Sequence, residues 1–463
     1  MSITDTTTQP RTARVRTYAI QGLEVRDVQI TVDVRPGLPS LTVLGLSDLA
    51  GRHLRERLQH AFSREGYRLP TRRTTIEISP SSVHKQDRTF DLAIAIALLI
   101  ASGQAERGTI HRAAIVGALT DDGTLRHVPG TFAMAEQASH DDRQLISAAD
   151  RPEELEGAGL DPVAIPRTLK ETIEAFCGGY ALLAPQGLPA PPEHPASSLD
   201  LADLYGKDQA IRAMQIAATG RFSLLLIGPV GCGKTLLARR MPGLLPPMSA
   251  QERREVRRIH STHSAPLTLG RPLRVPHPAT SLPVMVGGGE HTHVGELGLA
   301  HHGVLYLDDV VAVADDVLDR VFEVLAAGEH VVHRHGRTSR LPADALLLAG
   351  ASPCGCGHKP HNCTCEPEDR DAYRQRLEQL AGRFDLVVAV PDITCEQVPI
   401  TPPVTTRQAS EDVQRAHARL ARREHKPAAR TQQVAEAIAA LDGCDRPGPE
   451  HHQQAAALTA MSR

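Results

Sequence analysis

Apolar and polar residues alternate along residues 18–46 of this chain. A period of two is typical of half-buried strands, so this stretch predicts a β-meander with a turn at Pro36-Gly37. Over residues 49–62 the apolar positions instead recur every four residues, which predicts a helix. The outer face of that helix carries Arg52, Arg55, Arg57 and Arg64. We interpret these arginines as a solvated helix face, with DNA contact as the alternative.

The pattern then predicts an α/β domain that ends near residue 180. Its further elements are a strand at 76–78, a strongly apolar helix over 90–101 and a hairpin around Asp122-Gly123. Residues 182–198 are rich in proline, which neither strand ladders nor helix interiors accept, so they predict a linker.

Residues 224–236 predict a strand followed by a glycine-rich loop, after an amphipathic helix over 201–217. The loop contains Gly228, Gly231 and Gly233-Lys234-Thr235, which fits the phosphate-loop pattern of nucleoside triphosphatases. Glycines let backbone N–H groups approach phosphate oxygens, and the helix that follows adds a favourable dipole. Lys234 would then reach the phosphates and Thr235 would hold Mg²⁺. The alternative is a glycine-rich turn with an accidental Lys-Thr pair.

A second apolar strand, over residues 303–307, ends in Asp308-Asp309. A phosphate-loop ATPase needs acidic residues opposite its loop, so Asp308 is expected at the Mg²⁺ shell and Asp309 beside the attacking water. The helix predicted over 315–327 has one apolar stripe and is expected to be core. Residues 331–341 resemble a hairpin, and its arginines are candidates for DNA phosphate contacts: Arg334, Arg337 and Arg340.

Four of the eight cysteines cluster as two C-x-C pairs, Cys354-x-Cys356 and Cys363-x-Cys365. Four soft ligands at this spacing suit a tetrahedral structural Zn²⁺. Unmetallated thiols and an iron–sulfur cluster are the alternatives, and His358 and His361 could substitute as ligands.

Composition narrows the class of protein. A chain of 463 residues with 41% hydrophobic residues suggests about three globular domains. The net charge of −3 gives no overall basicity, and the absence of Trp argues against a base-stacking surface. The longest apolar run is too short to span a bilayer, and the threonine-rich N-terminus lacks the apolar core of a signal peptide. We therefore expect a cytoplasmic protein without a membrane partner.

Taken together, these motifs resemble the bacterial Mg-chelatase-like AAA+ family, the YifB and ComM group. The matching segments follow one order along most of the chain. They are residues 18–34, 45–48, 90–92, 206–208, 228–235, 271–276, 286–289, 295–296, 299–301, 303–309, 353–357 and 383–385.

The resemblance implies an α/β fold with two principal domains. It implies a flexible segment over 1–17, a Lon-protease-like domain over 18–180, a linker over 181–199, an AAA+ core over 200–395 with the cysteine loop, and a short helical C-terminal lid over 396–463. It also implies a homo-oligomeric ring, a hexamer, that acts on single-stranded or branched DNA during transformation or recombination.

Several site residues follow from the resemblance. Lys234, Thr235 and Asp308 fall on the nucleotide and Mg²⁺ positions, and Arg383 resembles an arginine finger that would enter a neighbouring subunit's site. An arginine that is structural in its own subunit is the alternative.

The chain also departs from the family pattern. Asp309 stands where Glu is usual, Ser352 stands where the sensor Asn is usual, and the tail stops early at Ser462-Arg463. We therefore expect ATP binding with weakened hydrolysis.

The Lon-like domain raises the question of proteolysis, because Ser81, Ser82 and Lys85 lie close together. The surrounding residues lack the expected nucleophile environment, so packing or partner binding is favoured over a Ser–Lys dyad. The function expected from the sequence is an ATPase that remodels DNA. A hydrolysis-poor assembly or regulatory module is the alternative. A third possibility, metal insertion into a tetrapyrrole, is supported only by the name of the family.

Overall fold

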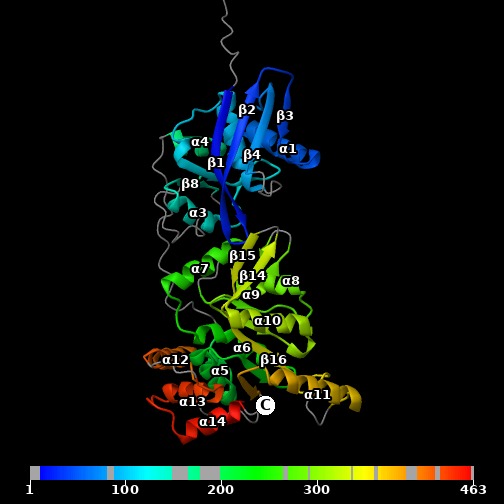
Figure 1. The fold of residues 1–463 in the computed structure, drawn as a ribbon, viewed down its shortest axis with the longest axis vertical. Coiled ribbons are helices and arrows are strands. Elements are labelled where there is room, and N and C mark those ends of the chain that lie inside the picture. The colour runs from blue at the N-terminus through cyan, green and yellow to red at the C-terminus, as the bar shows by residue number, and fades with distance from the viewer. Residues whose placement is uncertain are drawn as a thin grey trace, which may run out of the picture. The chain divides into compact units, whose positions relative to one another are not determined.

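The computed structural model describes residues 11–80, 88–148, 165–177, 199–263, 270–289, 292–334, 337–358, 363–392, 404–422 and 428–459. The chain forms two compact units (Figure 1). The N-terminal unit comprises residues 1–190 with 257–267, and the C-terminal unit comprises residues 191–256 with 268–463. None of the helices in these described ranges combines the length and apolar composition that a membrane span needs.

The N-terminal unit is built on a six-stranded mixed sheet with the order β3-β4-β2-β1-β5-β8. The strands are β1 (Arg11–Gln21), β2 (Glu24–Arg35), β3 (Ser40–Val43), β4 (Arg73–Ser79), β5 (Ala113–Val116) and β8 (Gln144–Ser147). The ladders β1·β2 and β2·β4 are antiparallel, and the others are parallel. Strand β1 begins at Arg11, which lies inside the segment expected to be flexible.

The predicted β-meander is wrong in its third strand. Strand β3 pairs with β4 and not with β2. The reason is that a strand has only two edges, and those of β2 are occupied by β1 and β4. The chain after Pro36-Gly37 is left with the outer edge of β4.

Helices cover both faces of this sheet. They are α1 (Asp48–Arg64), α2 (Asp91–Ser102), α3 (Thr131–His140) and α4 (Leu169–Cys177). Successive side chains of a strand point to opposite faces of its sheet, so neighbours on β1 belong to different cores. Ala19 packs with α1, α2 and α4, whereas Tyr18 packs with α3. The predicted hairpin at Asp122-Gly123 is confirmed by the pairing of β6 (Ala118–Leu119) with β7 (Leu125–Arg126).

One arginine of α1 does not lie on a solvated face. The Arg57 side chain is 10% exposed, and its guanidinium pairs with Asp91 through Nε–Oδ2 and Nη2–Oδ1 distances of 2.7 and 3.0 Å. The prediction that Arg57 decorates the outer face is therefore wrong. Position 57 directly precedes the buried Leu58, so the apolar face of α1 is wide enough to include it.

The C-terminal unit contains a five-stranded, wholly parallel sheet with the order β10-β13-β16-β9-β17. Its strands are β9 (Leu224–Ile227), β10 (Leu273–Arg274), β13 (Val304–Leu307), β16 (Leu346–Ala351) and β17 (Leu386–Ala389). Strand β16 is central and entirely buried. In a parallel sheet the carboxyl ends of all strands share one edge, which is where ligands bind in such folds.

Helices also cover both faces of this second sheet. The core on one face is shared by α5 (Asp208–Gly220), α6 (Lys234–Leu244), α12 (Thr406–Ala421), α13 (Arg430–Leu441) and α14 (Pro449–Thr459). The core on the other face is shared by α8 (Leu282–Val286), α9 (Glu296–Leu299), α10 (Asp315–Ala327) and α11 (Pro367–Ala381). Helix α7 (Ala250–Ser261) contributes its last residues to the N-terminal unit.

The bounds of α10 match the predicted helix. The predicted hairpin is also confirmed, as β14 (Glu329–Arg334) pairs antiparallel with β15 (Arg337–Pro342). The helix predicted over 201–217 begins only at Asp208: Leu201–Asp203 form a separate short 3-10 turn, and Gly206, with a left-handed φ of 64°, lies between the two.

Candidate nucleotide-binding site

The glycine-rich loop lies at the carboxyl edge of the parallel sheet, between the end of β9 and the start of α6. It borders a cavity of about 420 Å³. The cavity is lined by Val230, Gly231, Gly233, Lys234, Thr235, Leu236, Asp308, Asp309, Ala351 and Ser352. The fold therefore gathers most of the predicted site residues around one hollow.

The glycines of the loop serve different purposes. Gly231 and Gly233 have φ values of 83° and 98°, a left-handed backbone that side chains disfavour. Gly228 instead has no room for a side chain, because an added Cβ would lie 2.5 Å from the Val390 carbonyl oxygen and 2.6 Å from the Cys232 sulfur. The loop can follow this path only with glycine at these positions.

Lys234 and Thr235 differ in what they contact: Lys234 turns back to its own loop, and Thr235 meets the acidic strand end. Lys234 Nζ donates to the carbonyl oxygens of Gly228 and Pro229, at 2.6 and 3.0 Å. The Thr235 hydroxyl donates to Asp308 Oδ2 at 3.2 Å. A hydroxyl and a carboxylate oxygen are hard ligands of the kind that Mg²⁺ prefers, so this pair fits a magnesium ion bound together with a triphosphate.

Tyr306 is a site residue that the sequence reasoning missed. It is fully buried, and its hydroxyl donates to Asp308 Oδ1 at 2.9 Å. Burial and the nearby Asp308 raise the pKa of Tyr306 far above its ordinary value, so the phenol stays a donor. The signal was present, because residues two apart on a strand share a face.

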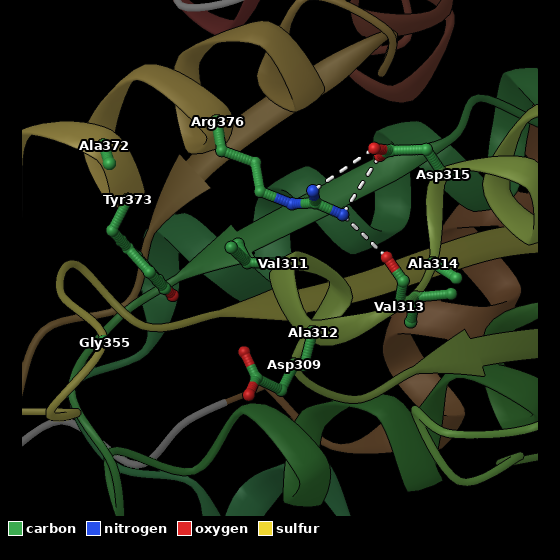
Figure 2. A pocket seen from close by; sticks show the side chains of 10 residues that line it. All are labelled: Asp309, Val311, Ala312, Val313, Ala314, Asp315, Gly355, Ala372, Tyr373 and Arg376. Atoms are coloured by element: carbon green, nitrogen blue, oxygen red, sulfur yellow. Dashed lines mark hydrogen bonds and ion pairs between the residues drawn. The ribbon is translucent and has the colours of Figure 1, made fainter. Parts of the chain in front are cut away.

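Asp309 lies at the border between two cavities. It lines the loop cavity and also a neighbouring one of about 810 Å³, to which Tyr373 and Arg376 of α11 contribute (Figure 2). Burial and the negative Asp308 raise the pKa of Asp309, and Lys234 opposes the rise. Its φ of 53° is left-handed, a conformation that Asp accepts more readily than most side chains.

Arg376 does not pair with Asp309. Figure 2 shows its guanidinium directed to Asp315 and the Val313 carbonyl, at 3.0 and 2.8 Å. The Asp309 carboxylate thus faces its cavities without an arginine partner among the contacts drawn there.

Ser352 and Arg383 differ in their relation to the site. Ser352 lines the loop cavity, and its carbonyl accepts from the Tyr373 hydroxyl at 3.0 Å. Arg383 does not line this cavity. Its guanidinium pairs with Asp319 at 2.7 Å and lies 4.2 Å from the centre of the Phe322 ring. Its finger role stays a prediction, and to play that role it would have to leave Asp319.

The four clustered cysteines converge. Their sulfur atoms all lie within 4.8 Å of one another. Cys354 is 3.1 Å from Cys363 and 3.4 Å from Cys365, and Cys356 is 3.7 Å from Cys363. A disulfide would need about 2.05 Å, whereas the edge of a tetrahedron with 2.3 Å zinc–sulfur bonds is about 3.8 Å. The donor set therefore fits a tetrahedral thiophilic metal.

Local hydrogen bonding favours the thiolate form at one of these positions. Donation from the backbone of His358, and then of Thr364, lowers the pKa of Cys356 to about 5. A metal ligand must be deprotonated, so Cys356 is prepared for that role at neutral pH.

The remaining candidates fall at or beyond the edge of the described residues. Arg340 pairs with Glu329 across the hairpin, and Arg334 and Arg337 are register partners at its end. Ser81, Ser82 and Lys85, the residues of the Ser–Lys question, and His361 lie outside the described residues.

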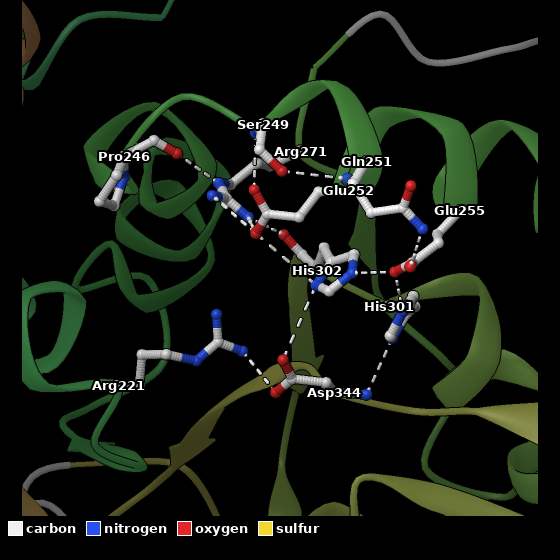
Figure 3. A network of polar contacts seen from close by, with 10 residues as sticks. All are labelled: Arg221, Pro246, Ser249, Gln251, Glu252, Glu255, Arg271, His301, His302 and Asp344. Atoms are coloured by element: carbon white, nitrogen blue, oxygen red, sulfur yellow. Dashed lines mark hydrogen bonds and ion pairs between the residues drawn. The ribbon is translucent and has the colours of Figure 1, made fainter.

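A second polar cluster lies at the opposite, amino edge of the same sheet, since His301 and His302 precede β13 and Asp344 precedes β16. Figure 3 shows its contacts. Glu255, His301 and His302 lie close enough to share a metal. However, His301 Nδ1 accepts the Asp344 backbone N–H at 3.0 Å, so in the neutral ring Nε2 carries the proton and faces Glu255. That leaves His301 no lone pair for a metal.

Ion pairs and hydrogen bonds hold this cluster together. Arg271 lies 3.5 Å from Glu252, Arg221 pairs with Asp344 at 2.6 Å, and His302 Nε2 contacts Glu255 at 2.7 Å. We interpret the cluster as a structural network that joins α7 to the amino end of β13.

A parallel sheet whose strand β9 enters a phosphate loop beside an acidic strand end is the architecture of phosphate-loop nucleoside triphosphatases. Comparison with known proteins agrees. The family described as magnesium chelatase, subunit ChlI, matches residues 200–398. A second description, subunit ChlI of Mg-chelatase, matches residues 30–150.

Individual relatives extend the match over most of the chain. YifB of Salmonella typhimurium is 35% identical over 385 residues, which cover 82% of this chain and 76% of YifB. The competence protein ComM of Haemophilus influenzae is 33% identical over 391 residues, with 82% and 76% covered. The magnesium-chelatase 38 kDa subunit of Acidiphilium rubrum is 28% identical over 177 residues, 32% of this chain and 51% of that subunit. The chain therefore belongs to the Mg-chelatase-like family that includes YifB and ComM, as the resemblance predicted.

Proposed function

We propose that this chain is an ATP-binding AAA+ protein that works as a homo-oligomeric ring, a hexamer, and couples ATP hydrolysis to DNA remodelling. The observation that carries the nucleotide part is the contact between Thr235 and Asp308 beside Lys234, since it joins a phosphate loop to a magnesium-binding acid. The DNA part is supported by the similarity to a protein named for competence. Branch migration in transformation or recombination is the activity that fits this similarity.

Each residue has a proposed role. Gly228, Gly231 and Gly233 shape the loop, Lys234 holds the phosphates, and Thr235 and Asp308 hold Mg²⁺. Asp309 polarises the attacking water, Ser352 contacts that water or the terminal phosphate, and Arg383 enters from a neighbouring subunit. Bound ATP would supply the phosphoryl group, and Mg²⁺ would supply positive charge that offsets the negative charge of the phosphates.

The proposal includes a domain layout. Residues 18–180 form a Lon-like domain, 181–199 a linker, 200–395 the AAA+ core and 396–463 a helical lid. The packing of α12, α13 and α14 with α5 and α6 in one core supports the last assignment. We also propose that the protein is cytoplasmic and that the cysteine loop holds a structural Zn²⁺.

DNA phosphates are proposed to contact the β14–β15 hairpin through Arg334, Arg337 and Arg340. Arg340 would exchange its partner Glu329 for a phosphate. Replacing the three arginines with glutamine should reduce the slope of log affinity against log salt concentration. Each phosphate contact that is lost means that fewer counterions leave the DNA when the protein binds. An unchanged slope would reject these contacts.

A hydrolysis-poor assembly module is the second candidate, and Asp309 favours it. The side chain is one methylene shorter than the Glu usual in the family, and a general base displaced by about 1 Å can lose much of its effect. In this alternative ATP binding stabilises the ring without fast turnover.

The rate of ATP turnover with and without single-stranded DNA separates the two candidates. We expect DNA-stimulated turnover that Lys234→Ala abolishes, with Lys170→Ala as the matched control because Lys170 is exposed in the other unit. ATP binding without DNA-stimulated turnover would support the assembly module. Failure of the wild-type protein to bind ATP would refute both.

A further inference from the structure

The cysteine loop touches the phosphate loop. The Val230 N–H donates to the Gly357 carbonyl at 2.9 Å. Gly357 has a φ of 77°, and a Cβ there would lie 2.4 Å from Val230 Cγ2. The Val230 side chain is 73% exposed, so little else of the chain packs against the crest of the phosphate loop.

Gly357 belongs to the turn that carries two of the metal-binding candidates. Its N–H donates to the Cys354 carbonyl at 2.9 Å, which closes a turn over residues 354–357. The position of Gly357, and with it the support of Val230, therefore depends on what holds Cys354 and Cys356.

The other two cysteines connect the turn to α11. Cys363 and Cys365 directly precede this helix, and Tyr373 within it donates to the Ser352 carbonyl at 3.0 Å. Ser352 lines the nucleotide cavity and lies two residues before Cys354. A metal bound by all four sulfurs would thus tie together the phosphate loop, the strand end at Ser352 and α11.

We infer that a thiophilic divalent cation, for which Zn²⁺ is the best fit, binds the four cysteines and holds Gly357 against Val230, so that its occupancy sets the affinity of the phosphate loop for ATP. This inference rests on the proposed nucleotide-binding function. Without the cation, nothing joins the four cysteine sulfurs, and the turn over residues 354–357 can move away from Val230. The nucleotide would then have to order the phosphate loop when it binds. The free energy that this ordering costs would weaken the affinity for ATP.

The size of the effect follows from the contact that is lost. One hydrogen bond of this kind changes an equilibrium by about fivefold to tenfold. We therefore expect the dissociation constant of a fluorescent ATP analogue with Mg²⁺ to rise by about that factor when the metal is lost.

The test uses the full chain with three variants. Zinc content and analogue affinity are measured for the wild-type protein, Cys363→Ser, Gly357→Ala and the control Cys177→Ser, whose cysteine is exposed in the other unit. The wild type and the control should hold about one zinc ion per chain and bind the analogue equally. Cys363→Ser should lose the zinc and bind about fivefold to tenfold more weakly.

Gly357→Ala separates the coupling from loss of folding. It keeps all four thiols, so zinc should be retained, but its Cβ pushes against Val230 and should weaken analogue binding. Hydrogen exchange at the Val230 amide should speed up in both site variants.

The outcomes distinguish this inference from the proposed function. Full zinc content in Cys363→Ser, or zinc loss with unchanged affinity, would overturn the inference alone. Unchanged affinity in Gly357→Ala would do the same. Zinc-loaded wild-type protein that fails to bind the analogue would overturn the proposed function, and this inference with it.

Discussion

Replacing Arg57 with leucine should strongly destabilise the N-terminal unit. The guanidinium holds Asp91 through two short contacts, and the two side chains are 10% and 3% exposed. Without it, the buried carboxylate at the first residue of α2 loses the cation that hydrogen-bonds to both of its oxygens. Breaking a buried ion pair in this way costs about 3–5 kcal/mol, much more than loss of an exposed pair.

The loss should depend on pH in a defined direction. Burial raises the pKa of Asp91, and Arg57 opposes that rise. In the Arg57→Leu protein the pKa rises further, so the native state binds more protons than the unfolded state above the ordinary aspartate pKa of about 3.9. The free energy of unfolding of this variant should therefore fall as the pH rises above about 3.9 and level off once the Asp91 carboxyl of the folded state has lost its proton.

Hydrogen exchange of α2 amides is the suitable assay, since it reports unfolding of this unit separately from the other. Arg55→Leu is the matched control, because Arg55 is exposed on the same helix and should change stability by less than about 0.5 kcal/mol. The double variant Arg57→Leu/Asp91→Leu should recover most of the loss. An Arg57→Leu protein as stable as the control would refute the reasoning.

The remaining predictions concern the nucleotide site and the polar network. Asp309→Asn keeps a residue that accepts a left-handed backbone but removes the base, so ATP turnover should fall about 100-fold or more while equilibrium ATP binding persists; a fall below threefold would argue against the base role. Tyr306→Phe removes the donor to Asp308, so the Mg²⁺ concentration for half-maximal nucleotide binding should rise about tenfold, and an unchanged Mg²⁺ requirement would exclude this role. Burial, followed by the neighbouring His302, lowers the pKa of His301 to about 4. The unfolded chain therefore binds an extra proton between about pH 4 and 6.5, and stability should rise across that window by up to about 3 kcal/mol. His301→Asn should flatten this rise in thermal unfolding.

The sequence predicted those parts of the fold that local patterns determine. The apolar stripe of α10 predicted the residues at which this helix begins and ends. The β14–β15 hairpin was also predictable, because its two strands are adjacent in the sequence. The partner of β3 and the burial of Arg57 could not be predicted this way. Both depend on segments that are distant in the chain, namely β4 and Asp91.

The same division applies to the site. The phosphate loop and Asp308 are recognisable because their chemistry requires particular residues at fixed spacing. Tyr306 escaped notice because a tyrosine in an apolar strand reads as core until its hydroxyl is seen to meet Asp308. The contact of Gly357 with Val230 gave no signal at all, since it arises from two loops that meet only in the folded chain.

Strand register connects these pieces and explains why the site is sensitive to its core. Strand β16 places Ala351 opposite Ile227, just before the phosphate loop, and Ala349 opposite Leu307, just before Asp308. Between them lies Gly350, where a Cβ would be 2.5 Å from the Tyr306 hydroxyl. Strand β16 therefore sets the separation between the phosphate loop and Asp308, and its Gly350 leaves room for the Tyr306 hydroxyl that contacts Asp308. The chain then continues from β16 through Ser352 into the cysteine loop. Because a shift of one residue would reverse every side chain on a strand, the register of β16 positions the phosphate loop, the Thr235–Asp308 contact and the cysteine loop relative to one another.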